Sequence, residues 1–400
     1  MANVSSSNGL EKRPKLRFPG FDEPWRAAQL GDLLIELSDY ATQESGFPLL
    51  TSSRQGLFVQ EDYFTDKQAN AETTVFSVLP YGCITYRHMS DDNIFHFNIN
   101  RLVANGLVSK EYPVFTIRKD VLDTDFLVDT LNSSPLFSVF CIQQKKGGTR
   151  TRLYFKTLCS YQMFLPALHE QQVIASFIRL LDKRIARQMA LVETLKKYKR
   201  GLLNQIFSAI SKGSQLRKLR ELVHVSGGKT PSMSNSLYWN GDIVWISSKD
   251  MKSSRISGSE LKITNLALNE LTLYHPGTLL LVARSGILKH SLPLAILEVD
   301  ATINQDIKAL QVHGCNAFYL YYAILSQEDN IIRTLVKTGT TVQSLMMDSF
   351  LNIEIPTPDI DLQQSIVDKL AKLEKYVDVQ EKELSLLSQM RNGLLQQLFI

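Results

Sequence analysis

The sequence predicts an α/β protein with two mixed α/β domains in pseudo-twofold repeat, separated by two long antiparallel coiled-coil helices. The chain of 400 residues is too long for one ordinary core. A stretch near residue 170 recurs 192 residues later, and short alternating apolar runs precede each copy. We therefore expect an N-terminal extension (1–29), a first globular domain (30–160), a central helix (161–212), a second globular domain (213–355) and a C-terminal helix (356–400).

The repeat aligns residues 166–207 with residues 358–399 without a gap, and thirteen of the 42 positions are identical. Both copies begin with a proline and a Gln-Gln pair and end in GLL-x-Q-x-F. The match continues upstream, where KKGGTRTRL at 145–153 falls on KTGTTVQSL at 337–345. The chain is therefore predicted to consist of two half-molecules, each a globular region followed by a long helix.

Both copies of the repeat carry apolar residues at alternating steps of three and four, the spacing of a helix with one apolar seam. Eight of ten seam positions are apolar in each copy, and the polar exceptions are equivalent: Gln188 with Gln380, and Lys199 with Arg391. We hypothesise that the two glutamines fix the register of the pair. Every second seam position, starting from the first, is Ile174, Leu181, Gln188, Leu195 and Leu202, with Ile366, Leu373, Gln380, Leu387 and Leu394 in the second copy; the positions between them are Ile178, Ile185, Val192, Lys199 and Ile206, with Leu370, Val377, Leu384, Arg391 and Leu398.

The two predicted helices have net charges of opposite sign, which favours packing of one helix against the other. Residues 169–207 have a net charge of +5 and residues 360–398 one of −1. Each helix would extend ~60 Å at about 1.5 Å per residue. Two such helices in one chain, each after a globular region, would most simply lie antiparallel and hold the globular regions apart. The alternative is two core helices of a larger bundle, which the narrow seam disfavours.

Both globular regions contain short alternating apolar runs, as β-strands do. VFSVLPYGCITYR and EYPVFTIRK are predicted strands of the first region, and GDIVWISS, PGTLLLVARSG and DIKALQV are predicted strands of the second. AFYLYYAILSQEDNIIRTLV has the length and spacing of a helix. QLGDL at 29–33 loosely matches KLREL at 218–222, so the repeat reaches the start of each half.

Composition excludes several classes of protein. Hydrophobic residues make up 44% and charged residues 21%, which rules out a disordered or collagen-like chain. The four cysteines form no CxxC pair, so a disulfide framework or zinc site is not expected. No apolar run approaches the roughly 18 to 20 residues of a membrane span, and the N-terminus has no hydrophobic signal core. We expect a cytoplasmic protein without membrane contact.

Positive charge in the first region is concentrated in one loop. Residues 30–160 have a net charge of −3, yet residues 143–156 hold five basic residues and no acid. Such a concentration favours phosphate binding, and glycines let backbone N–H groups approach the anion. The alternative is a solvated hairpin without a ligand, which the duplication of the loop disfavours. The predicted DNA-binding residues are Lys145, Lys146, Thr149, Arg150, Arg152 and Lys156, with Lys337, Thr340, Thr341 and Gln343 in the second copy.

The second region offers candidates in SGGKTPS (226–232), YWNGDIVWISSKD (238–250) and ARSG (283–286). Their basic side chains suit phosphates or guanine edges, and their hydroxyls can donate to phosphates or bases. Any one of them is more often an ordinary loop residue, so the prediction concerns the set. It comprises Lys229, Thr230, Ser247, Ser248, Lys249 and Arg284, with Arg54 of LLTSSRQG as a loose counterpart in the first region.

Catalytic motifs are not recognisable. The sequence has no GxxxxGK[ST] loop, no methyl-donor fingerprint and no cluster among its seven histidines. Asp300 with Asp306-Ile307-Lys308 faintly resembles a nuclease carboxylate-x-lysine site, although an exposed ion pair explains these residues equally well. We expect no catalytic residue, no metal site and no cofactor in this chain.

Taken together, the patterns resemble the DNA specificity subunit of type I restriction-modification systems. The likeness rests on two variable regions, each followed by a P-x4-QQ-x-I helix, on PKLRFPGFDEPW, SGGKTPS with YWNGDIVWISS, NQD at 304–306 and IPTPDIDLQQSIVDKL. It covers the chain after residue 14. It implies that each globular region is a target recognition domain reading one half of a split DNA site, while the helices set the spacer.

The resemblance also implies partners. These are double-stranded DNA, two methyltransferase (modification) subunits docked on the helices, and ATP-dependent restriction/translocase subunits. S-adenosylmethionine, ATP and Mg are expected on those subunits, with no catalysis in this chain. Because the first region lacks a counterpart of SGGKTPS, the two half-sites are expected to differ. The remaining alternatives are a coiled-coil scaffold without DNA contact and a metal-dependent nuclease.

Overall fold

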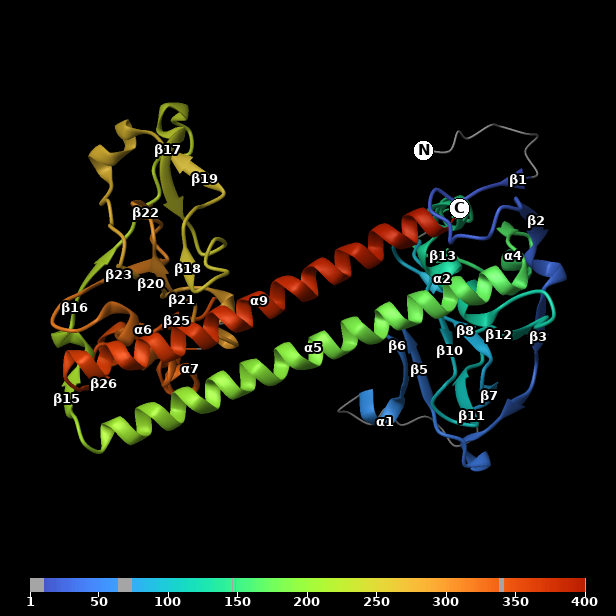
Figure 1. The fold of residues 1–400 in the computed structure, drawn as a ribbon, viewed down its shortest axis with the longest axis horizontal. Helices are drawn as coiled ribbons and strands as arrows, with labels where there is room; N and C mark the ends of the chain where they lie inside the picture. The colour runs from blue at the N-terminus through green and yellow to red at the C-terminus, as the bar shows by residue number, and fades with distance from the viewer. Residues whose placement is uncertain (1–10, 64–73, 146, 148, 338–341, 400) are drawn as a thin grey trace. The chain divides into compact units, whose positions relative to one another are not determined.

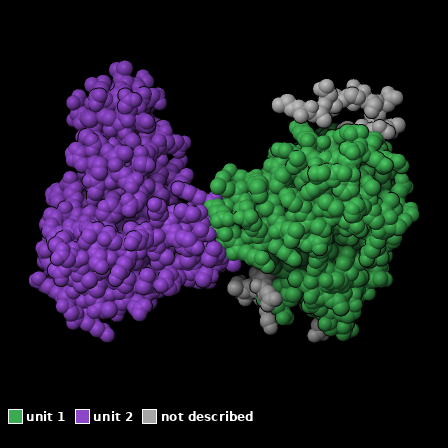
Figure 2. Space-filling model, in the orientation of Figure 1, with its two compact units in different colours: residues 1–188, 383–400 green, residues 189–382 purple. Residues whose placement is uncertain are grey.

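The computed structural model describes residues 11–63, 74–145, 147, 149–337 and 342–399. The chain divides into two compact units, unit 1 with residues 1–188 and 383–400 and unit 2 with residues 189–382 (Figure 2). Two long helices each contribute to both units. They are α5 (Leu168–Ser211) and α9 (Ile360–Leu398), at the places where the repeat predicts them (Figure 1). The predicted fold class, mixed α/β with two long helices, is confirmed.

Unit 1 is built on a four-stranded antiparallel sheet of order β10-β8-β12-β3. Its buried side chains, Phe115 among them, pack with those of α2, the helix that follows β12. The elements are β3 (Leu34–Leu37), β8 (Ile84–Tyr86), β10 (Phe97–Ile99), β12 (Val114–Ile117) and α2 (Thr124–Ser133). Shorter elements are β1 (Glu11–Lys12), β5 (Leu50–Ser53), β6 (Gly56–Val59), α1 (Gln60–Tyr63), β9 (Met89–Ser90), α3 (Pro135–Gln143), β13 (Thr151–Arg152) and α4 (Phe155–Cys159).

Unit 2 is built on a five-stranded sheet of order β16-β23-β20-β21-β18. The elements are β16 (Val223–Gly227), β18 (Arg255–Ile256), β20 (Leu279–Val282), β21 (Leu294–Leu297), β23 (Ile307–Val312) and α6 (Ala317–Leu325). Also present are α7 (Glu328–Leu335), β24 (Val336–Lys337), β25 (Ser344–Leu345) and α8 (Met347–Phe350). The single helix predicted over 317–336 is thus two helices, because the backbone leaves the helical conformation at Gln327.

The two units share one framework. The strand order β10-β8-β12-β3 in unit 1 corresponds to β21-β20-β23-β16 in unit 2, and a helix follows the third strand of each list. Each framework is entered by a strand that pairs antiparallel with the strand before a long helix. These strands are β2 (Trp25–Gln29) with β14 (Gln162–Leu165), and β15 (Gln215–Lys218) with β26 (Glu354–Thr357). A 3-10 turn follows each entry strand, at Leu30–Asp32 and Leu219–Glu221, which is where QLGDL matches KLREL.

The units differ in a second, three-stranded sheet. In unit 1 it has the order β11-β7-β4 and is wholly antiparallel, whereas in unit 2 it has the order β19-β17-β22 and β17 runs parallel to β22. In its own unit each of these sheets lies away from the long helices (Figure 1). The strands are β4 (Tyr40–Ala41), β7 (Phe76–Pro80) and β11 (Asn105–Ser109), and β17 (Trp239–Ile246), β19 (Leu261–Ile263) and β22 (Ala301–Ile303).

A buried glutamine ties each long helix to its unit. The side chain of Gln171 accepts a hydrogen bond from the backbone N of Asp123 at 2.9 Å, and that of Gln363 accepts one from the backbone N of Asn316 at 2.9 Å. Asp123 and Asn316 are the N-caps of α2 and α6. The Gln-Gln pair of the repeat is therefore a structural feature that joins equivalent helices in each unit.

Within each unit the long helices run antiparallel. In unit 1 the carboxylate of Asp182 pairs with Arg391, and in unit 2 that of Glu374 pairs with Lys199. Lys199 and Arg391 are repeat equivalents, as are Asp182 and Glu374, so the basic seam residue of each helix is paired with a carboxylate at an equivalent position. All twenty seam positions, ten in each helix, are buried or half-buried, and Gln188 and Gln380 are half-buried.

The end of each long helix enters the core of the unit that carries the other half of the sequence. Phe399 packs edge-on against Phe126 of α2 in unit 1, with ring centroids 5.6 Å apart. Phe207 packs against Tyr319 of α6 in unit 2, with centroids 5.4 Å apart. Phe207 and Phe399 are repeat equivalents and both are buried. Each core therefore needs a residue from both half-molecules.

We expect Phe207→Ala to destabilise unit 2 by about 3–5 kcal/mol, because it removes a buried ring and leaves a cavity against α6. Hydrogen exchange measured peptide by peptide should show faster exchange in residues 213–355 and little change in residues 30–160. Tyr198→Ala removes an exposed ring from the same helix and is the control. Equal loss of protection in both units would contradict this assignment of Phe207.

Candidate nucleic-acid interface

In unit 2 several predicted motifs meet at one end of the sheets. β17 and β22 are parallel, so their carboxyl ends leave the sheet together, and the backbone N of Asn304 donates to Ile246 O at 2.9 Å. Ser247 follows Ile246 directly. The backbone N of Lys229 donates to Ile303 O at 3.0 Å, which adds SGGKTPS to the same end.

Gly228 permits this approach of SGGKTPS to the sheet. A Cβ atom at Gly228 would lie 2.1 Å from the carbonyl oxygen of Ile303 and 2.4 Å from that of Asn304. No other residue fits there without moving the backbone. The approach allows the Thr230 hydroxyl to donate to the side-chain oxygen of Gln305 at 2.6 Å. The glycine pair of SGGKTPS therefore positions Lys229 and Thr230.

Arg284 joins this end of unit 2 through the strand that precedes it. The backbone N of Ala283 donates to Asp306 O at 2.8 Å, and Arg284 forms a β-bridge with Ser344. Ser344 also pairs with Lys337 in the β24–β25 hairpin. The structure therefore brings together Arg284, Lys337 and Gln343, whose carbonyl accepts from Ser285 N at 3.0 Å. The predicted residues Thr340 and Thr341 lie outside the described residues.

The candidate side chains of unit 2 differ in their exposure to solvent and in whether they already have a hydrogen-bond or ion-pair partner. Arg284, Lys249 and Lys337 are exposed. The Nζ of Lys229 lies 3.4 Å from a carboxylate oxygen of Glu270. The Ser247 hydroxyl donates to the Asp250 carboxylate at 2.7 Å, so in this conformation it can accept but not donate another hydrogen bond, while Ser248 is half-buried.

In unit 1 the basic loop is held beside an acidic turn, Ser90–Asn93, which we call the SDDN turn. β13 pairs with β9, placing Thr151 opposite Ser90 and Arg152 opposite Met89. The Nε of Arg150 donates to Asp91 at 2.8 Å, and Arg54 forms an ion pair with Asp92. Lys145, Thr149, Arg152 and Lys156 are exposed, and Lys146 lies outside the described residues.

Residues 88–93 (HMSDDN), which contain the SDDN turn, occupy the place in unit 1 that residues 283–288 (ARSGIL) occupy in unit 2. The backbone N of Leu153 donates to His88 O at 2.9 Å, and that of its repeat equivalent Leu345 donates to Ala283 O at 2.9 Å. Residues 89–91 therefore correspond to residues 284–286. The candidate interfaces of the two units are equivalent in the fold but differ in charge, because unit 1 has two carboxylates where unit 2 has none.

Sequence reasoning missed the two aspartates of this turn. The hydrogen bonds of Arg54 and Ser90 hold the pKa of the Asp92 carboxyl well below its usual range, and the hydrogen bond to Asp92 raises the pKa of Arg54. A signal was present in the sequence, since HMSDDN and ARSGIL follow comparable strands, but at an offset of 195 rather than the 192 of the helices.

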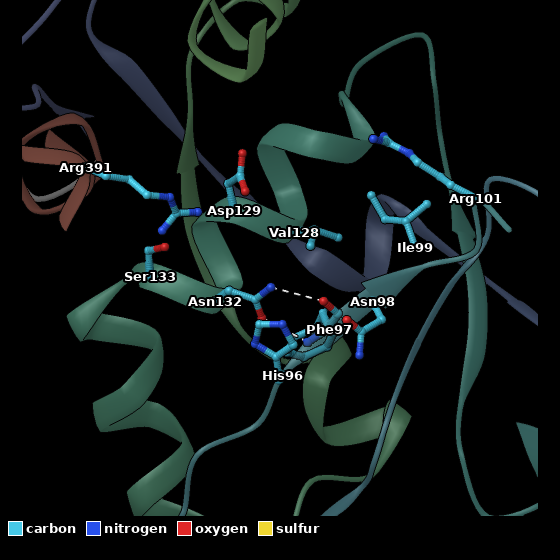
Figure 3. Close-up of a pocket in the computed structure, with 10 residues that line it drawn as sticks. All are labelled: His96, Phe97, Asn98, Ile99, Arg101, Val128, Asp129, Asn132, Ser133 and Arg391. Atoms are coloured by element: carbon cyan, nitrogen blue, oxygen red, sulfur yellow. Dashed lines mark hydrogen bonds between the residues drawn. The ribbon is translucent and has the colours of Figure 1, made fainter. Parts of the chain in front are cut away.

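A pocket of about 360 Å³ lies in unit 1 between α2 and the end of α9. Figure 3 shows the guanidinium of Arg391, from α9, reaching towards Asp129 and Ser133 of α2, with Arg101 at the opposite side of the view. The side-chain amide of Asn132 forms two hydrogen bonds with the backbone of Phe97. Its oxygen accepts from Phe97 N at 2.9 Å, and its nitrogen donates to Phe97 O at 3.0 Å. Burial, with the neighbouring charge of Asp182, raises the pKa of Asp129 to about 7.

Asp300 and Asp306, the carboxylates of the nuclease alternative, have different hydrogen-bond partners. A carboxylate oxygen of Asp300 lies 2.8 Å from Nδ1 of His275, within hydrogen-bonding distance. The backbone N of Asp306 instead donates to the side-chain oxygen of Asn304 at 3.1 Å. Among the residues that the structure describes, no three His, Cys, Asp or Glu side chains form a group that could hold a metal ion. None of the described helices combines the length and apolar character needed to span a membrane.

Residues 211–389 match the family model of the type I restriction modification DNA specificity domain. The chain is similar to a type I restriction enzyme specificity subunit of Escherichia coli, 35% identical over 207 residues, which are 50% of this chain and 51% of that protein. It is also similar to one from Methanocaldococcus jannaschii, 29% identical over 197 residues, 48% of this chain and 45% of that protein. The chain thus matches about half the length of these relatives.

Solved structures resemble the chain over nearly its whole length. The S subunit of a type I restriction-modification system from M. genitalium aligns with a TM-score of 0.59 and 16% identity, covering 97% of this chain and 99% of that one. A chain from a structural study of type I system assembly aligns with a TM-score of 0.57 and 14% identity, covering 96% and 99%. At this identity the likeness shows the fold.

Gly228→Ala should destabilise unit 2 by about 3 kcal/mol, because the added methyl group meets two backbone carbonyls that cannot yield. Thermal unfolding would measure the loss. Gly258→Ala is the matched control, since a Cβ there has no atom within 4 Å. If both variants unfolded at the wild-type temperature, the close approach of SGGKTPS to β22 would be wrong.

Asp129→Asn should stabilise unit 1 increasingly as the pH rises from about 4 to about 7. The folded state keeps the Asp129 proton up to about pH 7, whereas the unfolded chain loses it near the ordinary value of 3.8, so this stabilising contribution is present at low pH and lost as the pH rises. For a half-buried group we expect roughly 2 kcal/mol across this range.

Urea unfolding at a series of pH values would measure the effect of Asp129→Asn. The control is Asp120→Asn, because that carboxylate is 66% exposed. A stability difference between wild type and Asp129→Asn that stayed constant from pH 4 to pH 8 would contradict the raised pKa.

Proposed function

We propose that this chain is a specificity subunit of a type I restriction-modification system and that it reads a bipartite DNA site, one half-site with each unit. The proposal is supported by one observation above the others. The two units share a framework sheet, yet the equivalent end of each carries different basic and polar side chains. Two units with the same framework but different surface side chains could each bind a different half-site.

The chemistry of these surfaces suits duplex DNA. Exposed basic side chains attract phosphates, and they lie beside hydroxyl and amide side chains that can meet base edges. In unit 2 the exposed set includes Lys249, Arg284 and Lys337, and in unit 1 it includes Lys145 and Arg152. Because the SDDN turn has no acidic counterpart in unit 2, we propose that the half-sites differ in sequence.

We further propose that α5 and α9 set the spacer between the half-sites and dock two modification subunits, with ATP-dependent restriction subunits completing the complex. Within each unit an equivalent ion pair and the apolar seam fix how α5 and α9 pack, which supports a fixed spacer. Outside the seam, both helices expose side chains of both charges and some apolar ones, as a docking surface requires. S-adenosylmethionine, ATP and Mg would be bound by those partner subunits, and this chain would perform no catalysis.

Exchanging residues 30–160 for the same region of another family member should change one half-site and leave the other and the spacer unaltered. Each unit has its own core, so recognition should follow the exchanged region. Sequencing methylated adenines in the DNA of cells carrying the whole system would reveal the site. The reciprocal exchange of residues 213–355 should change only the other half-site. A change in both half-sites from one exchange would refute independent reading.

A further inference from the structure

Two exposed arginines of unit 1 are each held by a carboxylate of the SDDN turn. Arg54 pairs with Asp92, and Arg150 pairs with Asp91 through its Nε at 2.8 Å. The arginine side chains are 56% and 51% exposed, and those of Asp92 and Asp91 are 47% and 72% exposed. Both pairs therefore stand at the surface, although the arginines come from loops far apart in the sequence.

The carboxylate of Asp92 is itself held by further hydrogen bonds. Asp92 accepts hydrogen bonds from the Ser90 hydroxyl at 2.8 Å and the backbone N of Ile94 at 3.3 Å, in addition to Arg54. The turn is tied to the basic loop on its other side, where the Thr151 hydroxyl donates to the side chain of Asn93. The SDDN turn is thus held by its own hydrogen bonds and accepts from arginines of two separate loops.

The hairpin that carries Arg54 is also anchored. The side-chain amide of Asn98 donates to the Ser52 hydroxyl at 2.8 Å and to Ser53 O at 2.9 Å, and the Ser53 hydroxyl closes the turn by donating to Gly56 O at 3.1 Å. Asn98 is buried and belongs to β10 of the framework sheet. The position of Arg54 is therefore set by the core of unit 1 and not by a mobile loop.

We propose that Arg54 and Arg150 read guanine in the half-site of unit 1, each oriented by its aspartate; this rests on the proposed function. A guanidinium has five N–H donors in a planar fork, and guanine offers two adjacent acceptors, O6 and N7, in the major groove. Arg150 uses Nε for Asp91, which leaves both terminal nitrogens for the base. A guanidinium that is already oriented by an aspartate also loses less side-chain entropy on binding a base than an unpaired guanidinium does.

Because Arg54 and Arg150 are each paired with a carboxylate, they are poorly suited to contact phosphates. Asp91 and Asp92 would repel a phosphate placed beside them, whereas a base edge carries no net charge. Lys145 and Arg152, in contrast, form no ion pair with any carboxylate in the described part of the chain, and both are exposed. The unpaired cations suit phosphates, and the paired arginines suit bases.

The test is the methylated site found in cells that carry the complete system with Arg54→Lys or Arg150→Lys. Lysine keeps the charge but lacks the planar fork, so non-specific attraction remains while bidentate reading is lost. We expect a G·C pair in the half-site that changes when residues 30–160 are exchanged. Each variant should relax one such position by about 10- to 100-fold, with the other half-site unchanged.

Three further variants sharpen the result. Arg118→Lys is the matched control, because Arg118 is 53% exposed and pairs with Asp120 outside the SDDN turn, and it should leave the site unchanged. Lys145→Ala with Arg152→Ala should lower methylation at all sites without altering their sequence. Changing Asp91 and Asp92 together to asparagine should strengthen binding to unrelated duplex DNA yet relax the same positions, which loss of folding would not do.

The outcomes separate this inference from the proposed function. If the wild-type complex methylated no bipartite site, the proposed function would fail. If it methylated a bipartite site whose unit 1 half contains no G·C pair, or if both lysine variants kept the wild-type site, the function would stand and the reading by Arg54 and Arg150 would be wrong.

Discussion

The burial of two helix ends in the cores is the constraint on which the rest of the structure depends. Leu203 and Phe207 belong by sequence to the first half-molecule but are buried in unit 2, while Leu395 and Phe399 follow the second and are buried in unit 1. Neither core is complete without both halves. The repeat keeps GLL-x-Q-x-F in both copies because each copy fills an equivalent place against α2 or α6.

The helices and several framework strands could be predicted from sequence, whereas the order of the strands in the framework sheets could not. The apolar seam extends over ten positions in each helix, so its helical period is recognisable although only thirteen of the 42 aligned residues are identical in the two copies. Framework strands are two to six residues long, and a buried position requires only apolar character. Tyr86 in β8 and Leu281 in β20 are both fully buried, for example, although the side chains differ. Loop lengths then shift the offset from 192 to 195, which hides the correspondence.

The candidate interface was predicted as a set of basic residues, and its geometry depends on groups that no local pattern reveals. The partners of Arg54 and Arg150 are 38 and 59 residues away in the chain, so only the fold brings them together. Gly228 is required because the carbonyl oxygens of Ile303 and Asn304 lie too close for a side chain, which the sequence alone does not reveal. The basic composition predicts where anions are attracted, whereas the carboxylates determine which cations remain free for them.

The division between framework and interface explains how recognition can vary while the fold stays constant. Gln171 and Gln363 join the long helices to the caps of α2 and α6, and the helix ends pack on those same two helices. The SDDN turn and ARSG follow the second framework strand of each unit, on loops that make none of these contacts. Substitutions there change hydrogen-bond donors and charge without touching the residues that complete the cores. The surface chemistry of one unit can therefore diverge from that of the other while both keep the same helix pair.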